Sequence, residues 1–241
     1  MREPVQFTIF TLRMQAIVRE DPMSIRFAFW ITAAVCAVNG MAEGPRVRFV
    51  EGKGRIDIRF DDRPFTSYLF ADSLAKPVLH PLRSPSGLVV TRGFPLDPRP
   101  GETTDHPHHI GVFFTVDEVN GNGFWNALKP PPRIRHLRVT DKQEGKGHGT
   151  LSTVSHWTGM RGQVLLREDL TMAIHPEAGR TIVDFFIRLT AVDTAVTFSD
   201  TKEGMFAVRV ADWLRENGGT GRYLSSTGAE TEPDVWGRRA A

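Results

Sequence analysis

Three imidazoles and a carboxylate lie within five residues of this 241-residue chain, in the segment Asp105-His106-Pro107-His108-His109. A proline favours extended backbone at the preceding residue and fixes its own φ, so we expect His106 and His108 to face one side and His109 the other. Two imidazoles in one pocket suit metal binding through neutral nitrogens, which makes His106 and His108 candidate ligands of a divalent metal ion. They equally suit general acid–base catalysis near neutral pH, and structural hydrogen bonding is the third alternative.

Several polar or aromatic residues near this segment are candidates for binding a substrate. His80 precedes Pro81 and is expected in extended backbone, either at a strand end or in the site. Arg83 and Arg92 carry guanidinium donors that suit a hydroxyl or carboxylate group. Trp125 follows a glycine-rich turn and is a candidate platform for stacking a sugar, although core packing explains it equally well.

A later segment adds charged groups at the start of a predicted strand. Glu203 precedes Gly204, and if it faces the histidines it completes an acid–base pair with them. Lys202 beside it is a candidate substrate-binding residue. The alternative is a charged turn with no role in a site.

The elements that must position these residues are short strands. Residues 55–60 and 180–192 alternate polar and apolar side chains with the period of two that indicates a strand with one buried face. Further strands are predicted at residues 66–70, 88–92, 111–116, 134–140, 149–156, 164–174, 195–199 and 205–211. Turn signals separate them, and no helical pattern of twelve residues occurs. The sequence therefore predicts an all-β fold, an antiparallel β-sandwich.

The composition of the chain excludes some classes of binding partner and of structural site. The net charge is +2 and no run of Lys or Arg occurs, which argues against a nucleic acid as partner. Cys36 is the single cysteine, so a disulfide framework and a cysteine-based zinc site are excluded.

The N-terminal region has the pattern of a secretory signal peptide. In residues 23–42, a basic residue precedes an apolar stretch of about twelve residues that ends in small residues, too short to span a membrane. We therefore expect residues 1–22 to be a mis-assigned extension, residues 23–42 to be removed, and residues 43–241 to form one sandwich domain. A periplasmic or secreted location follows, with no membrane span after cleavage.

Five segments of the chain carry a resemblance to a known family. They read KPVLHPLRSPSGLVVTRGFP, DHPHHIGVFF, EVNGNGFW, DTKEGMFAVRVAD and VWGRRA, and they occur in the expected order between residues 46 and 239. In these segments the chain resembles the bacterial family labelled "methane oxygenase PmoA", a domain of unknown function. We do not infer methane oxidation or a copper centre, because no apolar stretch here has the length of a membrane span.

The resemblance implies a β-sandwich similar to the galactose-mutarotase-like supersandwich, in proteins associated with carbohydrate degradation. By analogy with such folds, His106, His108, His109 and Glu203 would transfer protons to and from a sugar, with Arg83 or Arg92 orienting it. Members of the family continue beyond VWGRRA into further strands, so we expect the chain to be truncated at its C-terminus.

Three functions remain open from the sequence. The first is an epimerase, lyase or hydrolase acting on a carbohydrate or sugar-derived substrate by His/Glu acid–base chemistry. The second is a metal-dependent enzyme with a divalent metal at His106 and His108. The third is a non-catalytic carbohydrate-binding module whose affinity depends on Trp125.

Overall fold

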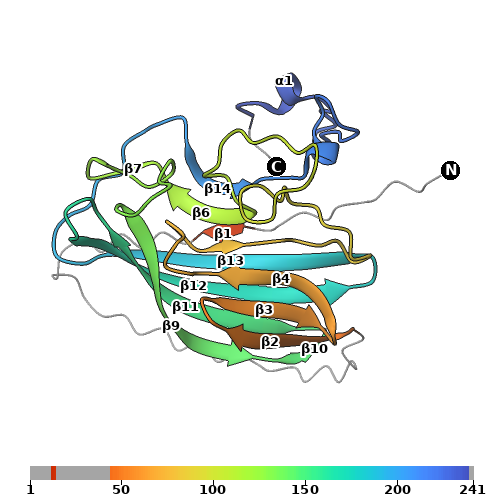
Figure 1. Cartoon of the computed structure of the whole chain (residues 1–241), viewed down its shortest axis with the longest axis horizontal. Coiled ribbons are helices and arrows are strands. Elements are labelled where there is room, and N and C mark those ends of the chain that lie inside the picture. Colours follow the sequence, from red (N-terminus) through yellow and green to blue (C-terminus); the bar gives the residue numbers. More distant parts are fainter. Residues whose placement is uncertain (1–11, 15–43, 239–241) are drawn as a thin grey trace.

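The computed structural model describes residues 12–14 and 44–238, and almost all regular structure in them is β-strand (Figure 1). The strands form two large open sheets and one small hairpin, and neither large sheet closes into a barrel. The predicted all-β sandwich is confirmed. The segment predicted to be a signal peptide, residues 23–42 with Cys36, lies outside the described residues. Within the described residues, no helix has the length and apolarity needed to cross a lipid bilayer.

The first sheet has the strand order β10-β2-β3-β4-β5-β6-β14 and is antiparallel throughout. Its strands are β2 (Arg46–Gly52), β3 (Arg55–Phe60), β4 (Arg63–Leu69), β5 (Val78–Leu79), β6 (Val112–Val116), β10 (Gly145–Lys146) and β14 (Gly204–Val208).

The second sheet has the order β1-β13-β12-β11-β9, and it is antiparallel except that β1 runs parallel to β13. Its strands are β1 (Leu12–Met14), β9 (Arg133–Gln143), β11 (Gly149–Thr158), β12 (Val164–Glu177) and β13 (Arg180–Ala191). The small hairpin pairs β7 (Glu118–Val119) with β8 (Asn122–Gly123). A 3-10 helix, η1 (Asp212–Leu214), and a short helix, α1 (Glu232–Val235), follow β14.

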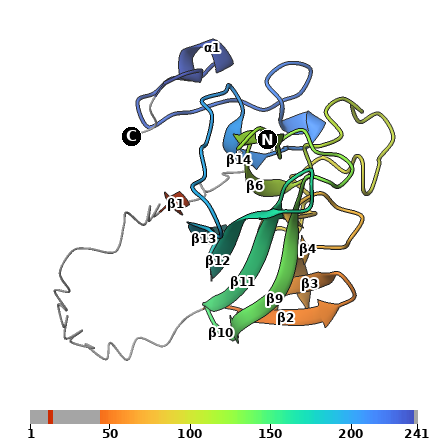
Figure 2. The same ribbon diagram turned by 90° about the vertical axis from the view of Figure 1, so that its left-hand side faces the viewer.

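The core forms where the inward faces of the two sheets meet (Figure 2). Ile56 and Ile58 on β3 and Val183 and Phe185 on β13 are all buried in one apolar cluster. These are the residues that the alternating pattern placed on one face of each strand. Removal of this apolar surface from water is the main force holding the sheets together.

Two predicted strands are wrong. Residues 88–92 and 195–199 form only isolated bridges, which join Val89 to Arg83, Thr91 to Val210 and Phe198 to Val119. In the second segment, backbone bonds from Asn120 N to Thr197 O and from Ser199 N to Glu118 O form the bridge. The Asn120 side chain adds two bonds to it, since its Oδ1 accepts from Thr197 N at 2.7 Å and its Nδ2 donates to Ala195 O at 3.3 Å. A side chain with strand-like donors and acceptors therefore holds an irregular segment in place.

A long loop, residues 80–111, connects β5 to the adjacent strand β6 and carries most of the candidate site. Leu79 and Val112 are paired, so the loop leaves the sheet and returns to its starting point. In Figure 1 this loop and the segment after β14 lie together at one end of the sandwich, beyond the long strands of the second sheet.

Candidate functional site

The three predicted histidines form a compact cluster at the end of the β5–β6 loop. His106 stacks on His109 with ring centroids 5.0 Å apart, and His108 lies 4.3 Å from His109 and 5.8 Å from His106. The expected extended backbone is wrong, because His106 has a φ of 43° and His109 N donates to His106 O at 3.0 Å. This turn brings His109 to the same side as the other two rings.

Asp105 is the charged hub of this turn. Its Oδ2 lies 2.7 Å from His106 Nδ1, and its Oδ1 accepts from Arg92 Nη1 at 2.6 Å and from Arg209 Nη2 at 2.7 Å. Partial burial raises the pKa of Asp105, but the bond from His106, the charge of Arg209 and the bond from Arg92 together hold that pKa well below its usual range. Asp105 is therefore a carboxylate at any physiological pH.

Arg92 was a candidate for contacting substrate, and the structure places its side chain beneath the loop. Its side chain is fully buried, and besides Asp105 it donates to Thr103 O at 3.3 Å and to His106 O at 3.0 Å. A rigid guanidinium fork with these partners fixes the loop that carries the histidines. Arg92 therefore positions the cluster from beneath and cannot reach a bound ligand.

Two further acidic residues brace the same loop. Asp212 accepts from Thr103 N at 2.6 Å and from Thr103 Oγ1 at 3.0 Å, which ties the loop to η1. Glu102 accepts from Gly93 N at 2.9 Å within the loop. The turn at Asp105 is thus fixed on both sides by charge-assisted hydrogen bonds.

His109 is bonded to Trp125. The indole Nε1 of Trp125 donates to His109 Nε2 at 3.2 Å, and the two rings meet edge to face at 5.6 Å. Burial, followed by the charges of His108 and His106, lowers the pKa of His109 to about 4. An indole N–H only donates, so Nε2 of His109 is an acceptor and its ring proton lies on Nδ1.

Trp125 was a candidate stacking platform, but its side chain is buried against Phe113 and His109. Trp125 therefore packs in the apolar core, as the second of the two sequence interpretations proposed. Lys76 lies behind it, donating from Nζ to Trp125 O at 2.8 Å with the ammonium 4.8 Å from the Phe113 ring centroid. Burial lowers the pKa of Lys76 to about 8.

His108 and Glu203 interact through charge. Burial first, then the charges of Lys76 and His106, lowers the pKa of His108, whereas the charge of Glu203 acts to raise it. Glu203 is half-buried just before β14 and pairs with Lys202 at 3.7 Å. Lys202 is itself exposed on 87% of its side chain, so it extends into solvent.

Two further candidates, His80 and Arg83, lie in the first part of the β5–β6 loop. His80 is 3% exposed, and neither ring nitrogen has a hydrogen-bond partner among the described residues. Burial, followed by the charge of Arg99, lowers its pKa to about 4. It therefore stays neutral inside the fold. Arg83 lines a cavity that Asp105 and Arg209 also line.

The metal-binding alternative concerned His106 and His108. Within residues 12–14 and 44–238, no group of three or more His, Cys, Asp or Glu side chains is arranged to hold a metal ion.

The sequence reasoning missed Arg209 and Lys76. Arg209 follows β14 and reaches Asp105 across 104 positions of sequence, and Lys76 precedes β5. Both are charged residues within mainly apolar stretches, which was the available signal. Their partners are set by strand pairing rather than by local spacing.

Fold and site together define an all-β sandwich with a surface His–Asp–Arg cluster on one long loop. The chain belongs to the family of unknown function DUF6807, whose model matches residues 55–241. This range includes every candidate site residue. No curated protein and no solved structure matched the chain.

Proposed function

We propose that this protein acts on a carbohydrate or sugar-derived substrate by acid–base catalysis at the histidine cluster, after export through the signal segment at residues 23–42. The observation that carries the proposal is the His106–Asp105 contact, 2.7 Å between Nδ1 and Oδ2. A carboxylate on Nδ1 fixes the ring and leaves Nε2 as the nitrogen that exchanges a proton with substrate. The His106 side chain is 53% exposed, so that nitrogen is within reach of a ligand.

The other histidines support distinct roles. His108 is half-buried with a lowered pKa, so it is neutral at physiological pH and suited to act as a base. The charge of Glu203 favours the imidazolium that forms when His108 accepts a proton. His109 is neutral with its proton on Nδ1, which suits it to donate a hydrogen bond to substrate.

The choice of a sugar rests on the resemblance of the five segments and on the chemistry of the cluster. Epimerisation, β-elimination and hydrolysis of sugars each need a proton removed from one position and delivered to another. Two or three imidazoles within 6 Å of each other, braced by a carboxylate, are suited to that transfer.

The test compares two histidines that each lie beside an aspartate. A panel of oligosaccharides and glycosides is incubated with protein, and products and epimers are followed by proton NMR. We expect His106→Gln to lower turnover by about 100-fold or more, the range of general acid–base effects. His175→Gln is the matched control, since His175 Nε2 lies 3.7 Å from Asp184 Oδ2 on the second sheet. Equal turnover in the two variants would rule out the proposed role of His106.

A further inference from the structure

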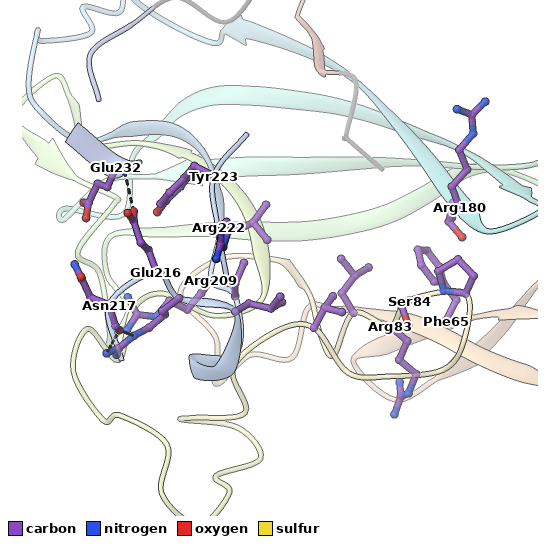
Figure 3. A pocket seen from close by; sticks show the side chains of 18 of the residues that line it. Phe65, Arg83, Ser84, Arg180, Arg209, Glu216, Asn217, Arg222, Tyr223 and Glu232 are labelled. Atoms are coloured by element: carbon purple, nitrogen blue, oxygen red, sulfur yellow. Dashed lines mark hydrogen bonds between the residues drawn. The ribbon is translucent and has the colours of Figure 1, made fainter. Parts of the chain in front are cut away.

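A cavity of about 680 Å³ is bordered by Asp105 and Arg209, and none of the three histidines of the cluster lines it (Figure 3). Both residues line it, together with the segment after β14 and residues of β4 and β13. Its volume falls in the range of about 300 to 1,000 Å³ that small-molecule sites occupy. The same carboxylate thus contacts His106 with one oxygen and borders this cavity.

One end of the cavity is densely polar. In Figure 3, Arg209, Arg222, Glu216, Asn217, Tyr223 and Glu232 gather there, while Arg83 and Arg180 extend away from them. Within the described part of the chain, no salt bridge engages Arg222. Arg180 is paired with Glu177 outside the cavity.

The charges at this end balance. Among the residues labelled at this end, the guanidiniums of Arg209 and Arg222 are matched by the carboxylates of Glu216 and Glu232. Burial and then the charges of Glu232 and Glu216 raise the pKa of Tyr223, so both carboxylates act at the phenol. An anionic ligand here would meet these carboxylates, and a cation would meet the guanidiniums. An uncharged ligand with many hydroxyls can accept from one set and donate to the other.

The middle of the cavity is apolar. Leu82 and Val90 of the β5–β6 loop line it together with Val208, Val210 and Leu214 from the segment around β14. Phe65 of β4 adds an apolar side chain at the end away from Arg222 (Figure 3). A free monosaccharide has no group to match this surface. A glycoside with an apolar aglycone has one, and its burial would add affinity in proportion to the area removed from water.

We propose that this cavity binds a neutral glycoside, with its sugar among Arg222, Tyr223 and Glu232 and its apolar aglycone against Leu82, Val90 and Leu214. The inference rests on the proposed function and deepens it, because it names a substrate class and places its binding in a cavity bordered by Asp105, the residue that contacts His106.

Calorimetric titration tests the proposal with matched ligands. The probes are p-nitrophenyl β-glucoside and β-galactoside, the two free sugars, and the corresponding p-nitrophenyl uronides. We expect at least one neutral glycoside to bind about tenfold more tightly than its free sugar, as burial of an aromatic ring predicts. We expect its uronide to bind about tenfold less tightly, since its carboxylate would lie beside Glu216 and Glu232.

Two pairs of variants locate the binding. Tyr223→Ala and Glu232→Gln should each weaken binding by about five- to tenfold, the scale of one lost stacking contact or hydrogen bond. Leu224→Ala and Glu230→Gln are the controls, as both are exposed neighbours outside the lining, and they should leave binding within about twofold. These side chains are exposed, so the fold is expected to tolerate all four changes.

Glycoside binding and turnover, both measured with the His106→Gln variant, distinguish the glycoside-binding proposal from the catalytic proposal. Unchanged glycoside binding with lost turnover supports both, and unchanged binding with retained turnover supports the cavity alone. The inference is overturned if no neutral glycoside binds, if free sugar or uronide binds as tightly, or if the control variants weaken binding as much as Tyr223→Ala and Glu232→Gln.

Discussion

Two tryptophans in this protein each donate an indole N–H to a titratable side chain, in very different surroundings. Trp157 Nε1 donates to Glu168 Oε2 at 2.8 Å inside the sandwich, and Trp125 Nε1 donates to His109 Nε2 at 3.2 Å at the loop end. Burial is the main cause of the pKa shift of both acceptors, raising that of Glu168 to about 7 and lowering that of His109 to about 4. Each shift favours the neutral form.

The difference between the two regions is access. Glu168 is 5% exposed among packed strands, and its shift reflects the free-energy cost of a charge in the core. His109 is part of a group of three imidazole rings, one of which is more than half exposed and bonded to Asp105. A shifted pKa therefore indicates a site only where titratable groups meet each other and solvent together.

The largest effect on stability is expected from Arg92. The loop end with the histidines depends on this side chain, whereas the Trp157–Glu168 pair in the core does not. Arg92→Met removes the donors to Asp105, Thr103 O and His106 O, and should lower the free energy of unfolding by about 2 to 3 kcal/mol. Urea unfolding measures this. Arg188→Met, an exposed change on β13, should cost less than about 0.5 kcal/mol. Equal losses in the two variants would show that the loop does not rely on Arg92.

His80 gives the protein an acid-sensitive stability. Its pKa is about 4 when folded and 6.5 in the unfolded chain, so the unfolded state binds more protons between these values. Its stabilisation is present above pH 6.5 and is lost as pH falls through 4, about 3 kcal/mol in all. His80→Leu should make the free energy of unfolding depend less on pH between pH 4 and 6.5. An unchanged slope would mean that His80 is not buried as a neutral ring.

Glu168 should act in the opposite direction. Its pKa is raised from 4.5 to about 7 by burial, so its contribution is present below pH 4.5 and is lost as pH rises through 7. Glu168→Gln keeps an acceptor for Trp157 and should raise stability at pH 8 relative to pH 5 by about 1 to 2 kcal/mol compared with wild type. Thermal unfolding at the two pH values checks this. If Glu168→Gln changed the stability equally at pH 5 and pH 8, the proposed role of Glu168 would be contradicted.

The smallest effect concerns the electrostatics of the cluster. The buried ammonium of Lys76 lowers the pKa of both His108 and His109, so Lys76→Met should raise both pKa values. NMR titration of the imidazole nitrogens measures this. The pKa of His136 depends on burial alone and should not move, so a rise there would indicate a general rearrangement.

Local patterns predicted the strands, because an alternating face is a property of adjacent residues. Ile56, Ile58, Val183 and Phe185 were placed in the core from spacing alone, and the histidine cluster was found from residue type. The turn at His106 was not predicted. It depends on Arg92, and on Arg209, which lies 104 positions from its partner Asp105 in the sequence. Contacts that strand pairing creates between distant residues leave no signal in the spacing of either segment.

The most direct test of the catalytic proposal is a double-mutant cycle on turnover with Asp105→Asn, His106→Gln and the double variant. If Asp105 acts by orienting His106, each single variant should lower turnover, and Asp105→Asn should add less than about twofold to the loss already caused by His106→Gln. Losses that multiply in the double variant would contradict the account, since the two side chains would then act independently.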